Sequence, residues 1–163
     1  FNRHCDRVRM ANIAQTINVL QAMILTDKEK MLLTPTYHVF EMYVPHHDAT
    51  WLPDELACAD YAMGEEKMPA VNVSASRDGT GRIHVTLCNL DPSRPAPIDC
   101  ELRGAKASRI SGRMLTAPDI AAHNTFDQPD RVKPAPFTDA RPSEKGFSAT
   151  LPPKSVVAIE IAP

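Results

Sequence analysis

The sequence predicts a mainly β protein, with an antiparallel β-sandwich over residues 69–163 preceded by an apolar N-terminal stretch. First, apolar and polar residues alternate along short segments that turn signals separate, as in sandwich strands. Second, 15 of the 163 residues are proline, which sheets confine to edges, turns and strand starts. Third, residues 6–26 are the most apolar continuous stretch, although few residues precede them to cover it. We therefore expect another part of a larger protein to cover this stretch.

The N-terminal stretch has two interpretations. Apolar residues recur at spacings of three and four, as on one helical face: Met10, Ile13, Ala14, Ile17, Leu20 and Ile24. Residues 8–14 also fit a buried strand followed by an irregular apolar run, because a fully buried strand need not alternate. Periodicity does not separate the two. Without neighbouring strands to pair with, we expect residues 8–25 to form a helix.

A short helix is predicted over residues 35–44. Thr34 is a good N-cap, and Pro35 suits the first helical position because its missing N–H would be unpaired there anyway. Tyr37, Phe40 and Tyr43 follow at helical spacing. We expect this aromatic face to pack against a neighbouring element; a platform for stacking sugars is the alternative.

His46-His47-Asp48 follows the predicted helix. These residue types bind metals, but adjacent residues rarely converge on one ion without a distant third ligand. We therefore expect a solvated loop and no metal site.

The β-sandwich begins with a predicted hairpin. Val71, Val73 and Ala75 alternate with polar residues, an Asp-Gly turn follows within residues 77–81, and alternation resumes from Ile83. Further strands are predicted at residues 98–102, 107–116, 147–151 and 155–161. Between them lies a proline-rich loop, residues 116–144, and we expect Phe126, Val132 and Phe137 to fix it to the body.

Composition excludes several classes of function. A net charge of −2 argues against a nucleic-acid partner. No apolar run reaches about 18 residues, so we expect no membrane partner and a soluble chain of undetermined compartment. Cofactor fingerprints do not occur, and no cofactor is expected. The four cysteines form no Cys-x-x-Cys pair and are expected to be small buried thiols: Cys5, Cys58, Cys88 and Cys100.

No candidate acid lies in an apolar setting at a strand end, which would raise its pKa for general-acid catalysis. The glutamates considered are Glu29, Glu41, Glu55, Glu65, Glu66, Glu101, Glu144 and Glu160. The residues alone therefore leave the function undetermined.

Four segments resemble α-L-arabinofuranosidases of glycoside hydrolase family 51, in chain order. They are Asn-Arg-His-Cys-Asp-Arg-Val-Arg-Met-Ala-Asn-Ile-Ala-Gln-Thr-Ile-Asn-Val-Leu-Gln (2–21), Thr-Pro-Thr-Tyr-His-Val-Phe-Glu-Met-Tyr (34–43), Ala-His-Asn-Thr-Phe-Asp-Gln-Pro-Asp-Arg-Val-Lys-Pro (122–134) and Leu-Pro-Pro-Lys-Ser-Val-Val (151–157). The resemblance implies a (β/α)₈ barrel followed by a C-terminal jelly-roll-like β-sandwich. Residues 1–52 would be the end of the barrel, with 8–14 as its last strand and 35–44 as its last helix. Residues 53–68 would be a linker and 69–163 the sandwich.

The resemblance also implies a function. The family contains retaining glycosidases that remove terminal α-L-arabinofuranosyl residues from polysaccharides or oligosaccharides, using two glutamates on earlier barrel strands. We therefore expect no catalytic residue in this chain and no activity of the isolated chain. Gln15 would hydrogen-bond the sugar, because an amide both donates and accepts; a polar residue at a helix or strand end is the alternative.

The partners implied are arabinofuranosyl glycans, the missing barrel and, for the isolated chain, other copies of itself through its exposed apolar stretch. The alternative function is a non-catalytic carbohydrate-binding or interaction module.

Overall fold

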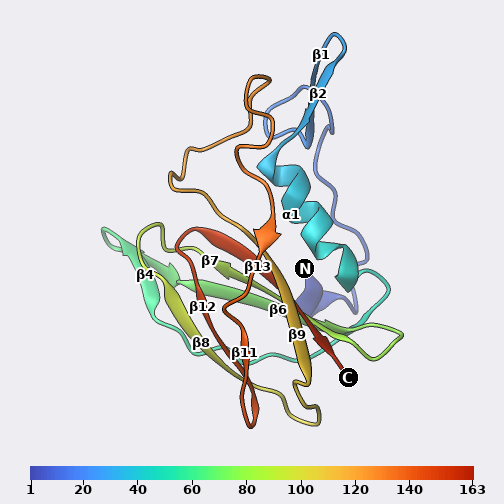
Figure 1. The fold of residues 1–163 in the computed structure, drawn as a ribbon, viewed down its shortest axis with the longest axis vertical. Coiled ribbons are helices and arrows are strands. Elements are labelled where there is room, and N and C mark those ends of the chain that lie inside the picture. The colour runs from blue at the N-terminus through green and yellow to red at the C-terminus, as the bar shows by residue number, and fades with distance from the viewer.

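The computed structural model describes all residues from 1 to 163, and its body is a sandwich of two antiparallel sheets (Figure 1). The larger sheet has the strand order β10-β9-β13-β7-β6-β3, and the smaller has the order β11-β12-β8. The larger sheet consists of β3 (Thr50–Trp51), β6 (Val71–Arg77), β7 (Ile83–Asn89), β9 (Arg109–Leu115), β10 (Ala135–Pro136) and β13 (Ser155–Ala162). The smaller consists of β8 (Ala96–Glu101), β11 (Arg141–Pro142) and β12 (Gly146–Leu151). The predicted mainly β fold is confirmed.

Two hairpins and three helical segments complete the chain. The hairpins are β1 (Ile24–Asp27) with β2 (Lys30–Leu33), and β4 (Asp60–Met63) with β5 (Glu66–Pro69). The helical segments are η1 (Asn2–His4), α1 (Pro35–Tyr43) and η2 (Val44–His46). The β4–β5 hairpin lies in the segment 53–68, which the sequence assigned to a linker, except for Pro69 at its end. No helix combines the length and the hydrophobicity needed to cross a membrane.

The β6–β7 hairpin forms as predicted, in continuous register from Val71 opposite Asn89 to Arg77 opposite Ile83. Asp78 closes its turn: one carboxylate oxygen accepts hydrogen bonds from the backbone N–H groups of Thr80, at 2.8 Å, and Arg82, at 3.1 Å. A side chain that binds its own backbone in this way mimics a turn, which is why the Asp-Gly signal identified it.

The hydrophobic core lies between the two sheets, where the alternating residues of the strands meet. The larger sheet contributes the inward face of β7 and β13, and the smaller sheet contributes the inward face of β12. The buried members are Val71, Ile83, Val85, Leu87, Phe137, Phe147, Ala149, Leu151, Val157, Ile159 and Ile161. Strand alternation therefore predicted most of the core correctly.

Helix α1 begins and ends as its sequence signals indicate. Thr34 is the N-cap, Pro35 is the first helical residue and the α-helix ends at Tyr43, one residue before the predicted Val44. The helix packs on the outer face of the larger sheet, where Met42 is buried against Leu115 and Val132. Of the predicted aromatic face, Tyr43 is partly buried and Phe40 stays exposed.

The expectation of a helix over residues 8–25 is wrong, and residues 8–14 form no strand either. Gln15, Asn18 and Gln21 have positive φ angles of 58°, 56° and 59°, which interrupt both structures. A short helix is marginal in water without a packing partner, and a strand needs neighbours for its backbone hydrogen bonds. The stretch pairs only near its end, through β1 and one isolated β-bridge. Met10 and Leu20 remain 75% and 93% exposed.

The long loop after β9 is fixed to the body at the predicted apolar residues. Val132 and Phe137 are buried and Phe126 is partly buried. The loop rises beside the β1–β2 hairpin, near the end of the molecule where α1 begins (Figure 1). It therefore brings a part of the sandwich next to the N-terminal third of the chain.

Candidate functional site

Gln15, the candidate sugar-binding residue, lies on an exposed turn beside the β1–β2 hairpin. The backbone of the next residue ties the turn to the hairpin: the Thr16 carbonyl accepts hydrogen bonds from the N–H groups of Met23, at 3.0 Å, and Ile24, at 3.2 Å. Ile17 and Ile24 form an isolated parallel β-bridge. The Gln15 side chain thus projects from a backbone whose path the hairpin determines.

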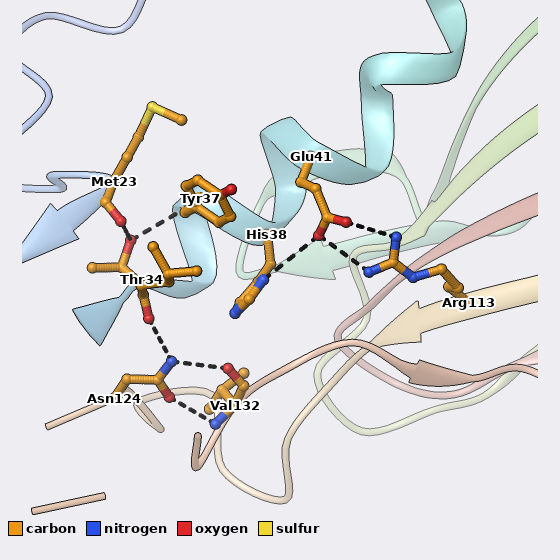
Figure 2. Close-up of polar contacts among 9 residues, drawn as sticks. Met23, Thr34, Tyr37, His38, Glu41, Arg113, Asn124 and Val132 are labelled. Atoms are coloured by element: carbon orange, nitrogen blue, oxygen red, sulfur yellow. Dashed lines mark hydrogen bonds and ion pairs between the residues drawn. The ribbon is translucent and has the colours of Figure 1, made fainter. Parts of the chain in front are cut away.

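The start of α1 holds the base of this hairpin. The Thr34 hydroxyl donates to the carbonyls of Ala22, at 2.7 Å, and Met23, at 3.2 Å, and accepts from the Tyr37 N–H at 3.4 Å. The Thr34 N–H also donates to the Met23 carbonyl at 3.0 Å. Figure 2 shows Met23, Thr34 and Tyr37 linked in this order. One residue therefore caps the helix and fixes the hairpin to it.

Asn124, in the long loop of the sandwich, joins the same region from the other side. Its side-chain N–H groups donate to the carbonyls of Leu33, at 2.7 Å, and Val132, at 2.9 Å, and its oxygen accepts from the Val132 N–H at 2.7 Å (Figure 2). The side chain is only 4% exposed. Both donors and the acceptor are used, as burial of an amide requires.

A polar cluster also joins α1 to the sheet. Arg113 on β9 donates to both carboxylate oxygens of Glu41, at 2.8 and 3.1 Å, and His38 Nδ1 lies 3.8 Å from the same carboxylate (Figure 2). The hydrogen bonds from Arg113 lower the pKa of Glu41, and the same contact raises the pKa of Arg113. Both groups are therefore charged across the physiological pH range.

A half-open cleft of about 290 Å³ lies between α1 with η2 and the outer face of the larger sheet. Its wall includes two carboxylates, Glu41 and Glu160, together with His46, His84 and Arg113. A glycosidase acid requires a raised pKa. Glu41 has the opposite property because Arg113 stabilises its ionised form.

His46 corrects one expectation, since it does not lie in a solvated loop. Its Nδ1 is 2.7 Å from the Ser76 hydroxyl and its Nε2 is 2.7 Å from the Thr86 hydroxyl, so the ring bridges β6 and β7. Its pKa is lowered to about 4, mainly by burial and in part by the nearby rings of His84 and His47. Pro45 continues the chain into η2, which turns His46 toward the sheet while His47 and Asp48 stay exposed.

No group of three or more His, Cys, Asp or Glu side chains is arranged to hold a metal ion. The cysteines also differ in part from expectation: all four are free thiols, but Cys5 and Cys58 are exposed because they lie in segments outside the two sheets. Cys88 and Cys100 are partly buried, and burial raises the pKa of both thiols.

Sequence reasoning missed Asn124, Arg113 and His46 as residues that join the two parts of the chain. Their partners are far away in sequence: Asn124 and Leu33 are 91 residues apart, and Arg113 and Glu41 are 72 apart. Only Asn124 carried a signal, because it lies in one of the four segments that resembled a known family.

These contacts define a class of protein, an antiparallel β-sandwich domain that is joined to the preceding part of its chain. The larger sheet contacts the helix α1, and the long loop contacts the β1–β2 hairpin. Residues 1–155 match the family model described as "Alpha-L-arabinofuranosidase C-terminal domain", and the chain belongs to this family. The resemblance seen in the sequence is confirmed.

Individual relatives agree with this assignment. An intracellular exo-alpha-L-arabinofuranosidase of Bacteroides ovatus is 42% identical over 99% of this chain and 32% of its own length. An intracellular exo-alpha-(1->5)-L-arabinofuranosidase of Bifidobacterium longum is 25% identical over 97% of this chain and 30% of its own. The crystal structure of the GH51 arabinofuranosidase from Xanthomonas axonopodis pv. citri superposes with a TM-score of 0.96 at 46% identity, covering 99% of this chain and 33% of that one. The chain thus spans about a third of the length of the curated relatives that it matches.

Proposed function

We propose that this chain is the C-terminal part of a retaining α-L-arabinofuranosidase that removes terminal α-L-arabinofuranosyl residues from arabinose-containing polysaccharides or oligosaccharides. The observation that carries the proposal is the family match over residues 1–155, together with a similar protein from Bacteroides ovatus that is named an exo-alpha-L-arabinofuranosidase. Because the chain spans about a third of that relative, the rest of the enzyme has room for a catalytic barrel.

In this proposal, residues 1–52 complete a (β/α)₈ barrel, residues 53–68 link it to the body and residues 69–163 form a supporting sandwich. The exposed apolar side chains of Met10, Ile17 and Leu20 support this division, since such side chains are normally buried against a partner. The barrel that precedes them in the same polypeptide is that partner. The Glu41–Arg113 pair and the Asn124 contacts hold the sandwich to the barrel's last helix and hairpin.

Gln15 is the proposed substrate-binding residue. It would lie at the C-terminal end of the last barrel strand, the face on which barrel enzymes assemble their active sites. Its φ of 58° is unusual for a residue other than glycine, asparagine or aspartate, and such strained positions cluster at functional sites. The side-chain amide can donate to one sugar hydroxyl and accept from its neighbour.

Both catalytic glutamates lie upstream in this proposal, so the isolated chain is inactive. The pairing of Glu41 with Arg113 supports this assignment, because a glutamate kept ionised cannot protonate a leaving group. A retaining enzyme needs two carboxyl groups about 5–5.5 Å apart, one as acid and base and the other as nucleophile.

The test is the full-length enzyme acting on an aryl α-L-arabinofuranoside, followed by NMR spectroscopy of the first product. We expect arabinofuranose released initially in the α configuration, which retention requires. Gln15→Ala should lower kcat/KM by about 10- to 100-fold, the effect of losing one or two hydrogen bonds. His123→Ala, at an exposed position of the long loop, is the control and should leave kcat/KM unchanged. A first product in the β configuration would contradict the retaining mechanism. An unchanged kcat/KM in Gln15→Ala would contradict the role of Gln15.

The isolated chain tests the alternative of a carbohydrate-binding module. Affinity electrophoresis in gels containing arabinan should show no retardation of the chain. Retardation at low polysaccharide concentration would favour a binding module over a supporting domain.

A further inference from the structure

We propose that Asn124 is a positioning residue for the sugar-binding turn at Gln15, so that a loop of the sandwich organises the substrate site of the barrel. This inference rests on the proposed function, because it takes Gln15 to contact the arabinofuranosyl ring. Asn124 itself touches no substrate in this account and acts through the backbone of the β1–β2 hairpin.

The contacts that connect the two residues are short and continuous. Asn124 donates to the Leu33 carbonyl at 2.7 Å. Leu33 pairs with Ile24 across the hairpin, and the Ile24 N–H donates at 3.2 Å to the carbonyl of Thr16. Thr16 directly follows Gln15. One side chain of the sandwich is thus separated from the sugar-binding turn by a single pair of hairpin residues.

A second route runs through the helix cap. Leu33 is followed by Thr34, whose hydroxyl and N–H both bind the Met23 carbonyl. The Met23 N–H donates to the Thr16 carbonyl at 3.0 Å, so both routes converge on the same oxygen. Moving Leu33 would therefore change both hydrogen bonds that hold Thr16.

The backbone at Gln15 needs this support. A non-glycine residue at φ of 58° persists only where surrounding contacts determine its conformation. Weaker support at Thr16 lets the turn relax, and the Gln15 amide then spends less time in the orientation that binds the sugar. Loss of orientation reduces catalysis even when the contacting residue is intact.

Asn124 can transmit this support because its own position is fixed. Its oxygen accepts from the Val132 N–H, and Val132 is buried against Met42 of α1 and Leu115 of β9. The amide therefore bonds directly to the hairpin at Leu33 and reaches α1 through Val132. An aspartate of the same size would lose both donors, including the one to Leu33.

A double-mutant cycle in the full-length enzyme tests the proposal. Asn124→Ala should lower kcat/KM on an aryl α-L-arabinofuranoside by about tenfold, and Asn124→Asp should do the same. In a Gln15→Ala background, Asn124→Ala should lower kcat/KM by less than about twofold, since residues that act through one another are not additive. Equal effects in the two backgrounds would overturn the proposal.

Asn89→Ala is the matched control for a merely structural effect. Asn89 is also a buried asparagine with three hydrogen bonds, but these go to Arg94, Pro152 and Asp91, all within the sandwich. It should lower Tm about as much as Asn124→Ala and reduce kcat/KM by less than about twofold. A similar loss of kcat/KM from both variants would assign Asn124 a structural role only and overturn the proposal.

Hydrogen exchange gives a measurement that does not depend on activity. Backbone amides of residues 16–24 should exchange at least about tenfold faster in Asn124→Ala, and at an unchanged rate in Asn89→Ala. Unchanged exchange in Asn124→Ala would overturn the positioning role. A full-length protein without arabinofuranosidase activity would instead overturn the proposed function. Failure of the positioning role of Asn124 is therefore distinguishable from failure of the proposed function.

Discussion

Arg113 of β9 and Glu41 of α1 form a two-point ion pair, with both guanidinium N–H groups directed at both carboxylate oxygens, at 2.8 and 3.1 Å. The pair joins α1, the only α-helix, to the larger sheet of the sandwich. It is partly solvated, as the two side chains are 50% and 37% exposed. We therefore expect the pair to fix the orientation of α1 on the sheet as much as it stabilises the folded chain.

Glu41→Gln should lower the free energy of unfolding of this chain by about 0.5–1 kcal/mol at pH 7, the range for a well-formed but solvated pair. The pKa of Glu41 is depressed below its ordinary value of 4.5. Its contribution is thus complete above pH 4.5 and is lost as pH falls through the lower pKa of the folded state. Urea titrations across this range should show the two proteins converging in acid. Asp130→Asn breaks an exposed pair with Lys133 and should change little; an equal effect would contradict a special role for Glu41.

His46→Gln should remove part of the acid sensitivity of the chain. The folded-state pKa of His46 is about 4, against an ordinary value of 6.5, so the unfolded chain binds a proton that the folded chain rejects. Stability therefore falls as pH drops from 6.5 toward 4. Between pH 7.5 and 5.0 the unaltered chain should lose about 1–2 kcal/mol more unfolding free energy than His46→Gln. His123→Gln, at an exposed histidine, should leave the loss unchanged. Identical pH profiles for His46→Gln and the unaltered chain would refute the buried neutral ring.

Gly146→Ala should destabilise the sandwich by about 1–3 kcal/mol, the usual cost of overpacking. A Cβ at this position would lie 2.1 Å from the Cys100 carbonyl oxygen of the paired strand β8, and backbone cannot move aside cheaply. Gly79→Ala is the matched control, because a Cβ there would meet nothing within 4 Å. Chemical denaturation of both variants decides the matter, and equal midpoints would contradict the close approach of β12 and β8.

Local signals in the sequence predicted the elements that depend on local physics. Thr34 and Pro35 fixed the start of the helix, Asp78 closed the hairpin turn and alternation along β7 and β13 identified the core. Residues 8–25 were predicted wrongly because their apolar spacing indicated a helix, whereas the backbone turns at Gln15, Asn18 and Gln21, where φ is positive. His46 was misassigned because its partner Ser76 lies 30 residues away.

The candidate site was predictable only in part. Gln15 followed from family resemblance, and its role remains a prediction. The support that Asn124 gives to the hairpin could not be inferred, because no local pattern encodes a contact spanning 91 residues. Its residue type was still informative, since a buried amide must find partners for two donors and an acceptor.

The isolated chain should self-associate through its N-terminal stretch. Met10 and Leu20 are strongly exposed, and such surface promotes association. Analytical ultracentrifugation should show oligomers whose population rises with concentration. The double substitution Met10→Lys with Leu20→Glu should raise their dissociation constant at least tenfold. Met63→Lys, at an exposed methionine of the β4–β5 hairpin, is the control. A monomer at all concentrations, or an equal effect of Met63→Lys, would contradict this expectation.

The most direct test of the account compares the isolated chain with the full-length enzyme on the same aryl α-L-arabinofuranoside. If the catalytic glutamates lie upstream, the full-length enzyme releases the aryl group and the purified chain of residues 1–163 releases none above the uncatalysed rate. Turnover by the isolated chain, abolished by replacing Glu41 or Glu160, would show that the cleft beside α1 is itself an active site and would contradict the account.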